Sequence, residues 1–336
     1  MRWSRSFQIT LFALAICVGV VSVWYIDSQL EQNAQSDPIE SMTIGVAKSP
    51  LTSPFFVAQH LGLFAYHGLN IELIPCIGGN NCVKSMLAGE LDYATASESV
   101  AMFESFHHDD LALLVSFVES NNDVKLLTLA SNGISHIGGL RDKRIGVVKG
   151  SASEFYLDST LIASNLANLP IEKVDLLPNE MVTALLSKQV DAISAWEPFG
   201  YLASHRVGSD VYNLGVPGVY QLNFNLLSQR STVERNMAAS TALILALDDA
   251  INWIHANPVE AQRLVAETLQ VSQDELEWTW DDYLFRLSLG SSLLSNLQLE
   301  ARWALQRNLV TEPMPNFREL MFSQPYQVAF KQRINQ

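Results

Sequence analysis

A short apolar segment followed at once by a capped helix is the feature that most constrains the fold of this chain. Arg144 to Val148 is largely β-branched and apolar, which is typical of a strand buried on both faces. Gly150 permits a tight turn, and Ser151 or Ser153 can cap a following helix through its side-chain oxygen. A helix that starts behind a strand leaves backbone N–H groups free for an anionic or polar ligand, although the same serines can equally serve only as caps.

Strand and helix patterns alternate on both sides of this unit. Upstream, strands are expected at 42–47, 69–75, 92–96 and 111–118, and helices at 55–65, 80–88 and 97–106. A segment at 124–130 then carries the chain out of the first unit. Downstream, the strand at 144–148 and the helix from Ser153 are followed by a strand at 174–177, a helix at 180–187 and a strand at 192–195. This β-α-β-α-β order predicts a parallel-rich sheet with helices on both faces.

The last third of the chain reads mainly as helix. Residues 222–226 alternate again and are expected to form a return crossing, and 232–256 is expected to be one long helix without Gly or Pro. Pro258 opens the next helix. The remainder is expected to form helices that pack aromatic residues in the core, among them Trp278, Trp280 and Trp303.

Two stretches of similar pattern suggest two lobes of similar construction. In both Leu-Ala-Gly-Glu-Leu-Asp-Tyr-Ala at 87–94 and Leu-Ser-Lys-Gln-Val-Asp-Ala-Ile at 186–193, a helix ends and a polar turn leads through Asp into a strand. At 336 residues the chain is also long enough for two lobes. We expect the first part of lobe 1 at 41–128, lobe 2 at 129–224, and the mainly helical rest of lobe 1 at 225–336.

The N-terminal 40 residues form a different kind of segment. Arg2 and Arg5 precede 7–26, a run of twenty residues without charge that is long enough to span a hydrocarbon core. The arginines should stay on the cytoplasmic side, so the bulk of the chain is expected to be exported and to stay tethered to the membrane. A cleaved signal peptide is the alternative. The polar residues 29–40 read as a tether.

Cysteine spacing leaves two interpretations open. Cys76 and Cys82 enclose Ile-Gly-Gly-Asn-Asn, and in an exported protein they can form a disulfide or remain two free thiols. No further cysteine or histidine pair completes a zinc pattern around them. His107-His108-Asp109-Asp110 resembles a metal site in composition only, because adjacent histidines on a helix diverge. We therefore predict no metal and no cofactor.

Net charge limits the class of partner. The formal charge of -14 argues against nucleic-acid binding, which needs a basic surface. It also argues against adsorption to anionic lipid through a polybasic patch.

An ordered series of motifs resembles a known family. The series runs Ile-Gly-Val-Ala at 44–47, Phe-Phe-Val-Ala-Gln-His-Leu-Gly-Leu-Phe at 55–64, Gly-Gly-Asn at 78–80, the stretch at 87–94, 140–158, and Asp-Ala-Ile-Ser-Ala-Trp-Glu-Pro-Phe at 191–199. In this order it resembles the periplasmic solute-binding proteins of nitrate, sulfonate and taurine ABC transporters, which are related to thiamine-pyrimidine-precursor binding proteins. The resemblance implies the two-lobed α/β fold of type II periplasmic binding proteins, with ligand capture in a central cleft.

Ligands of such a fold meet loops and helix starts at the carboxyl ends of strands. The expected ligand-binding residues are Ser49, Phe55, Asn80 and Ser97 in lobe 1, and Ser151, Ala152, Ser153, Trp196 and Glu197 in lobe 2. Trp196 can stack on a flat or apolar ligand, or be an ordinary core aromatic. Glu197 can accept a hydrogen bond from an amine, or complement a helix dipole as a first-turn acid.

The resemblance implies the substrate-binding component of an ABC importer, with permease and ATPase subunits as partners and a sulfonate-, taurine- or nitrate-like small molecule as ligand. A membrane-tethered ligand sensor is one alternative. The other is an enzyme of the same fold related to the pyrimidine-precursor synthases, but no cysteine-rich site, Ser-His-Asp order or paired acids stands out, so we predict no enzymatic activity.

Overall fold

The computed structural model describes residues 41–216 and 218–334. One group of strands comprises β1 (Ser41–Ala47), β2 (Asn70–Cys76), β3 (Tyr93–Ser97), β4 (Leu111–Ser120), β10 (Leu222–Gln229) and β11 (Leu284–Ser288). These form a six-stranded sheet in the order β11-β4-β10-β3-β1-β2. The second group comprises β5 (Val124–Leu129), β6 (Arg144–Val147), β7 (Glu172–Asp175), β8 (Ala192–Trp196) and β9 (Val211–Asn213), which form a five-stranded sheet in the order β7-β6-β8-β5-β9.

Helices accompany both sheets. With the first sheet belong α2 (Ser53–His60), α3 (Leu63–Tyr66), α4 (Gly79–Leu87), α5 (Glu98–Ser105), α9 (Arg230–Arg235), α10 (Met237–Ala256), α11 (Pro258–Leu269), α12 (Gln273–Trp280), α13 (Ser291–Gln306), α14 (Phe317–Leu320) and α15 (Gln324–Ile334). With the second belong α6 (Ala152–Ala163), α7 (Met181–Leu186) and α8 (Phe199–Val207). Single 3-10 turns are η1 (Pro50–Thr52), η2 (Ala130–Asn132), η3 (Ile137–Leu140), η4 (Pro178–Glu180) and η5 (Gly208–Asp210).

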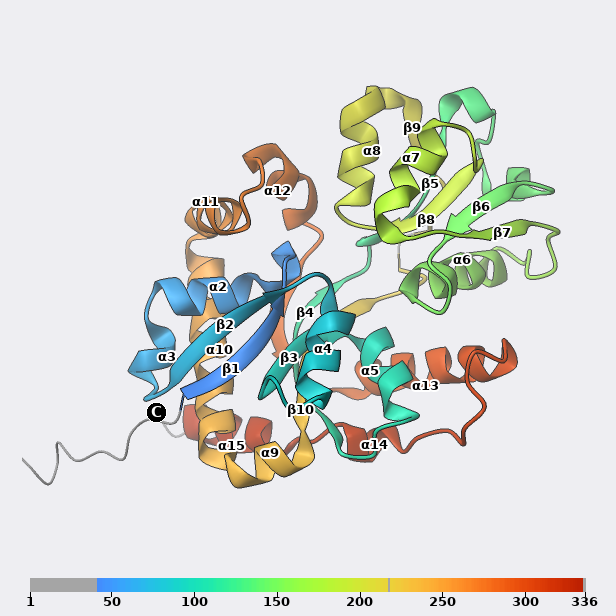
Figure 1. Ribbon diagram of the computed structural model, residues 1–336. Coiled ribbons are helices and arrows are strands. Elements are labelled where there is room, and N and C mark those ends of the chain that lie inside the picture. The colour runs from blue at the N-terminus through green and yellow to red at the C-terminus, as the bar shows by residue number, and fades with distance from the viewer. Residues whose placement is uncertain (1–40, 217, 335–336) are drawn as a thin grey trace, which may run out of the picture. The chain divides into compact units, whose positions relative to one another are not determined.

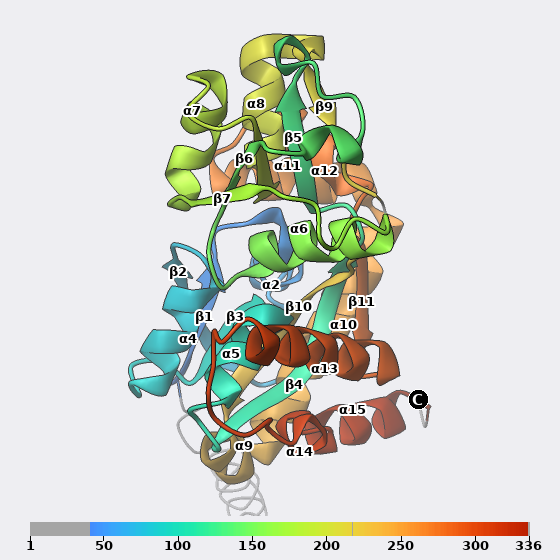
Figure 2. The same cartoon turned by 90° about the vertical axis from the view of Figure 1, so that its right-hand side faces the viewer.

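Each sheet is covered on both faces, as the predicted βα order requires. Helices α2, α3 and α10 pack together on one face of the first sheet, while α4, α5 and α13 cover the other (Figures 1 and 2). In the second sheet α6 lies on one face and α7 packs with α8 on the opposite face (Figure 1). Parallel pairing of β1 with β3 and of β6 with both β7 and β8 places strand ends and helix starts at one edge of each sheet.

The chain passes between the sheets twice. It leaves the first sheet at Ser120 and enters the second at Val124, and it returns between Asn213 and Leu222. We call the first sheet with its helices lobe 1 (41–120 and 222–334) and the second sheet with its helices lobe 2 (124–213). The expected boundaries at 128 and 224 fall inside β5 and β10, so the change of sheet comes earlier in both crossings. The apolar run of β5 does not reveal which strands it pairs with. In the structure β5 pairs antiparallel with β8 and β9, and so it belongs to the second sheet.

Three expected elements differ in the structure. The helix expected at 55–65 is interrupted at Gly62, whose φ of 67° is left-handed, and the long helix expected at 232–256 is broken at Asn236. The expectation of helices alone after residue 258 is wrong, because β11 pairs antiparallel with β4. Side chains of β11 alternate between buried and exposed as in a strand, since Phe285 is buried while Arg286 on the opposite face is exposed.

Helix α10 is the only helix among the described residues that is long and apolar enough to cross a membrane by length and composition. Half of its most apolar window is buried inside the protein, where the helix packs against α2, α11 and α15. Its apolar character therefore reflects its position in the core of lobe 1. The anchor predicted at 7–26 lies outside the described residues.

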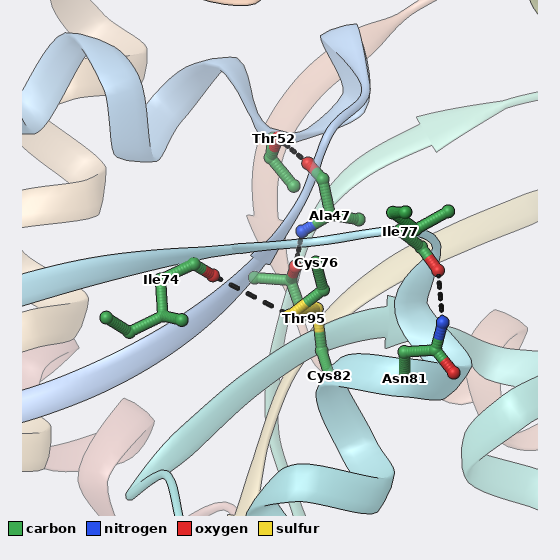
Figure 3. The surroundings of a disulfide bond; sticks show 8 residues. All are labelled: Ala47, Thr52, Ile74, Cys76, Ile77, Asn81, Cys82 and Thr95. Atoms are coloured by element: carbon green, nitrogen blue, oxygen red, sulfur yellow. Dashed lines mark hydrogen bonds between the residues drawn. A yellow bond between two sulfur atoms is a disulfide. The ribbon is translucent and has the colours of Figure 1, made fainter.

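A disulfide joins the end of β2 to the start of α4. Cys76 and Cys82 are linked across a Cα–Cα distance of 5.5 Å, within the usual range for such bonds (Figure 3). A Cβ on Gly45 of β1 would lie 3.1 Å from the Cβ of Cys82, so this glycine leaves the room that the bond occupies. The loop between the cysteines is closed further by Asn81, whose side chain donates to the Ile77 carbonyl at 2.8 Å (Figure 3).

Non-reducing peptide mapping of the purified protein is expected to recover one intrachain link between Cys76 and Cys82. Closing so short a loop should stabilise the protein by about 2 kcal/mol through the unfolded state, so reduction should lower the melting temperature by a few degrees. A Cys76→Ser/Cys82→Ser variant is the control, since its melting temperature should not respond to reductant. Complete alkylation of both thiols without reductant would contradict the prediction.

Candidate functional site

The lobe 1 residues expected at the site lie at the carboxyl ends of β1, β2 and β3, with one exception. Ser49 caps η1, where its side chain accepts from the backbone N–H of Leu51 at 3.2 Å. Ser97 caps α5 directly after β3, and Asn80 is exposed in the first turn of α4. Because these strands share one sheet edge, their helix starts lie along that edge.

Phe55 is the exception, because the structure places its side chain in the core. It is fully buried in α2 and packs edge-to-face on Phe117 of β4, with ring centroids 5.0 Å apart. Sequence position near a strand end does not decide which face of a helix a residue occupies. Phe55 supports the sheet beneath the expected site and has no free surface for a ligand.

Some backbone N–H groups at the start of α6 already donate to side chains of the same segment. Ser151 caps the helix and accepts from the backbone N–H of Ser153 at 3.2 Å, while Glu154 accepts from that of Gly150 at 2.9 Å. Ser153 is completely buried, and its hydroxyl donates to the carbonyl of Ser194 in β8. The reciprocal bond from Ser194 Oγ to the Ser153 carbonyl measures 2.7 Å. Ser153 therefore fastens α6 to β8, and the adjacent Ala152 is also buried.

Trp196 and Glu197 end β8 in different environments. Trp196 is partly exposed and packs edge-to-face on Phe199, with ring centroids 6.2 Å apart. Glu197 is buried, and its Oε1 lies 2.7 Å from Lys125 Nζ and accepts from Trp278 Nε1 at 2.9 Å. Glu197 is thus already paired with a cation and with an indole from α12 of lobe 1. The expectation that Trp278 is a core residue is wrong, since it is 46% exposed.

A group of acids surrounds the first crossing, and Glu197 is the one member that was among the expected site residues. Asp123 is buried, and Tyr283 of lobe 1 donates to its Oδ1 at 3.0 Å. Burial, followed by the nearby Glu197 carboxylate, raises the pKa of Asp123 to about 7, while Lys125 acts in the opposite direction. Lys125 also lies 3.7 Å from Asp282 of lobe 1. We call Asp123, Lys125, Glu197, Trp278 and Asp282 the crossing network.

Asp158 of α6 forms a second link between the lobes. Its Oδ2 accepts from Trp303 Nε1 at 2.8 Å and lies 2.8 Å from Arg307, both on the α13 side of lobe 1. Its Oδ1 lies 2.8 Å from Lys173 of lobe 2. Phe155, one turn earlier on α6, packs edge-to-face on Trp303 with ring centroids 5.3 Å apart. The lobes therefore contact each other directly through α6.

Two buried glutamates lie close together, Glu98 at the start of α5 and Glu300 within α13, and we call them the acid pair. Glu98 accepts from the hydroxyl of Tyr220 and from the backbone N–H of Asn223 at 2.6 Å. Glu300 of α13 accepts from Ser99 at 2.8 Å through Oε1, and its Oε2 has no hydrogen-bond partner among the described residues. Burial raises the pKa of Glu98 to about 7 and that of Glu300 well above its usual range.

Sequence reasoning could have found only half of the acid pair. Glu98 directly follows Ser97 behind a strand, which is the position of a helix N-terminus facing a ligand. Glu300 lies in the middle of a long amphipathic helix, where an acid is usually solvated. No spacing rule connects the two positions.

The described residues contain no group of three or more His, Cys, Asp and Glu side chains that could hold a metal ion. His107 lies 3.8 Å from Glu312 and His108 lies 3.5 Å from Glu104, so each faces a different acid.

Comparison with known proteins identifies relatives of this architecture. The sequence model of the family described as NMT1/THI5 like matches residues 49–261, well over half of the chain. A Brucella abortus protein named as a binding protein is 23% identical over 239 residues, covering 67% of this chain and 70% of its own length. A Bacillus subtilis protein named as an aliphatic sulfonates-binding protein is 22% identical over 247 residues, covering 71% and 73%.

Solved structures share the fold. The periplasmic aliphatic sulphonate binding protein SsuA from Escherichia coli superimposes with a TM-score of 0.75 at 18% identity, covering 84% of this chain and 92% of that one. The desulfurization enzyme DszB also superimposes, with a TM-score of 0.63 at 16% identity, covering 87% and 99%. The expected two-lobed α/β fold is confirmed, and it occurs in both binding proteins and an enzyme.

Proposed function

This chain belongs to the NMT1/THI5-like family, and on that premise we propose that it is the solute-binding component of an ABC importer. The observation that carries the proposal is the pair of separate α/β lobes joined by two short crossings, with helix starts of both at strand carboxyl ends. Matches to an aliphatic sulfonates-binding protein and to SsuA support a transport role. Its partners are then a permease and an ATPase, and its location is the periplasm, with residues 7–26 as a tether to the inner membrane.

The proposed ligand is a small polar or anionic solute of the sulfonate, taurine or nitrate kind, held between the lobes. Lobe 1 contributes Ser49, Asn80 and Ser97 at the ends of its strands. Lobe 2 contributes the α6 start at Ser151, and Trp196 covers the flatter part of the solute. The bonds within lobe 2 make Ser153 a support for this helix start, and those of Glu197 make it a link to lobe 1.

An enzyme of the same fold is the main competing function, because DszB shares the architecture. Among the described residues the cysteines are Cys76 and Cys82, and both are consumed by the disulfide. A nucleophilic thiol is therefore not available in this part of the chain. A membrane-tethered sensor would share the binding site and differ only in its partner.

A thermal-shift screen of sulfonates, taurine, nitrate and amino acids tests the binding role, since a bound ligand raises the melting temperature by mass action. For a solute found in this way, Trp196→Ala should weaken binding about tenfold or more in isothermal titration calorimetry, because a large aromatic surface at the site is lost. Trp280→Ala is the matched control. Trp280 packs on Phe285 inside lobe 1, so its loss should lower stability and leave the dissociation constant unchanged. Wild-type affinity in Trp196→Ala would remove Trp196 from the site.

A further inference from the structure

The acid pair combines two features that are rarely compatible: two buried carboxyl groups and no cation. Glu98 is 0% exposed and Glu300 is 1% exposed. Neither takes part in a salt bridge among the described residues, in contrast to Glu197, which has Lys125. An isolated ionised carboxylate is costly to bury, and two in one hydrogen-bonded group are costlier.

The hydroxyl groups of Ser99 and Tyr220 lie between the two carboxyl groups. Ser99 donates to Glu300 Oε1 at 2.8 Å, and its hydroxyl lies 3.5 Å from that of Tyr220, which donates to Glu98 Oε1. Two acids so close together influence each other's titration, and a proton held by the pair removes part of the cost of burying two charges. The raised pKa of Glu98, caused by burial, agrees with this geometry.

The position of the pair connects it to the proposed ligand. Glu98 is the first residue of α5, directly after the capping Ser97 at the carboxyl end of β3. A helix start at that sheet edge offers N–H groups to an anion. An ionised Glu98 in the same turn opposes an anion there, whereas a protonated Glu98 does not.

We propose that the acid pair makes capture of an anionic solute proton-linked, so that a sulfonate and a proton are bound together at the start of α5. This inference rests on the proposed function and adds a regulation of it. The affinity for an anionic solute is highest when the pair is protonated. By thermodynamic linkage, if protonation of the pair raises the affinity for the anion, then the bound anion raises the affinity of the pair for the proton.

The groups that face Glu98 are consistent with this behaviour. From α13 comes Glu300, from the return crossing Tyr220, and from β10 the backbone N–H of Asn223. Asp123 at the first crossing adds a further acidic influence that raises the pKa of Glu98. Phe155 of lobe 2 packs on Tyr220 with ring centroids 5.7 Å apart, so the second lobe helps to cover the pair.

Isothermal titration calorimetry with propanesulfonate, which stays an anion throughout, tests the linkage between pH 6 and pH 8. We expect the dissociation constant to rise about tenfold over this range, with proton uptake visible as a dependence of the heat on the buffer's ionisation enthalpy. Glu98→Gln keeps the shape of the side chain without its charge and should flatten the profile. Glu104→Gln, on the same helix but outside the pair, is the matched control and should keep the wild-type slope.

Infrared difference spectroscopy of the ligand-free protein supplies a readout that needs no solute. A carboxylic acid band near neutral pH that disappears in Glu98→Gln/Glu300→Gln supports a shared proton, and its absence overturns the proposal. A flat profile in the wild type, an unchanged slope in Glu98→Gln, or affinity that rises with pH also overturns it. If neutral or cationic solutes bind but no sulfonate does at pH 6, the proton linkage is contradicted while the binding role is retained. If no solute binds at all, both proposals are contradicted.

Discussion

Replacement of Lys125 by methionine is expected to lower the free energy of unfolding by about 3–5 kcal/mol. The ammonium group of Lys125 is the cation of the crossing network, and it lies 2.7 Å from the buried Glu197 and 3.7 Å from Asp282. Methionine fills a similar volume but leaves the buried Glu197 beside Asp123 without its cation. Most of the loss therefore comes from the carboxylate that remains, and only a small part from the side chain that is removed.

Urea denaturation of Lys125→Met and wild type measures this loss. Arg263→Met is the matched control, because Arg263 pairs with Glu260 and Glu267 on the surface of α11 and should contribute less than about 1 kcal/mol. Lys125→Met/Glu197→Gln should recover much of the lost stability, since the double change removes the unpaired charge together with its partner. Equal effects of Lys125→Met and Arg263→Met would show that Glu197 is solvated.

The second large effect is on pH dependence: the protein should lose about 2–4 kcal/mol of unfolding free energy between pH 5.5 and pH 8. Burial raises the pKa of Glu98 and of Asp123 to about 7 in the folded state, well above the ordinary range that both regain on unfolding. A raised carboxyl pKa means that the folded protein binds more protons than the unfolded chain does. The stabilisation from these two groups is therefore complete below the unfolded pKa and is lost as pH rises through about 7.

Urea denaturation at several pH values in this window measures the slope. Glu98→Gln and Asp123→Asn should each remove part of it, because each variant replaces a titrating group with a permanently neutral one. Glu260→Gln, on the surface of α11, should leave the slope unchanged. Stability that rises with pH over this range would show that these carboxyl groups are ionised in the folded state.

Local patterns were sufficient for most of the fold. The β-branched run at Arg144 and the serines behind it gave β6 and α6, because such a strand needs two covered faces and the serine oxygen caps the helix. Pairing partners were harder, since a strand pattern such as that of β5 does not say which sheet it joins. The strand β11 was missed because it consists of five residues within a largely helical region.

The strand ends and helix starts around the candidate site were predictable from the sequence, but their electrostatic surroundings were not. Strand ends and helix starts placed Ser97 and Ser151 at sheet edges, because capping and strand signals act over a few neighbouring residues. The partners of Glu197 and Glu98 come from distant segments, with Trp278 81 residues and Asn223 125 residues away in sequence. Contacts of that range follow from tertiary packing, which a single sequence does not display.

The bonds of Asp158 have a consequence for how quickly a solute between the lobes could exchange. Trp303 and Arg307, on the α13 side of lobe 1, tie down α6 of lobe 2. In the proposed binding role a solute enters and leaves only while the lobes are apart, so these bonds slow both steps. Bonds that form equally in the empty and the filled shut protein do not weaken binding, and their strength therefore sets the residence time of the solute and not its identity.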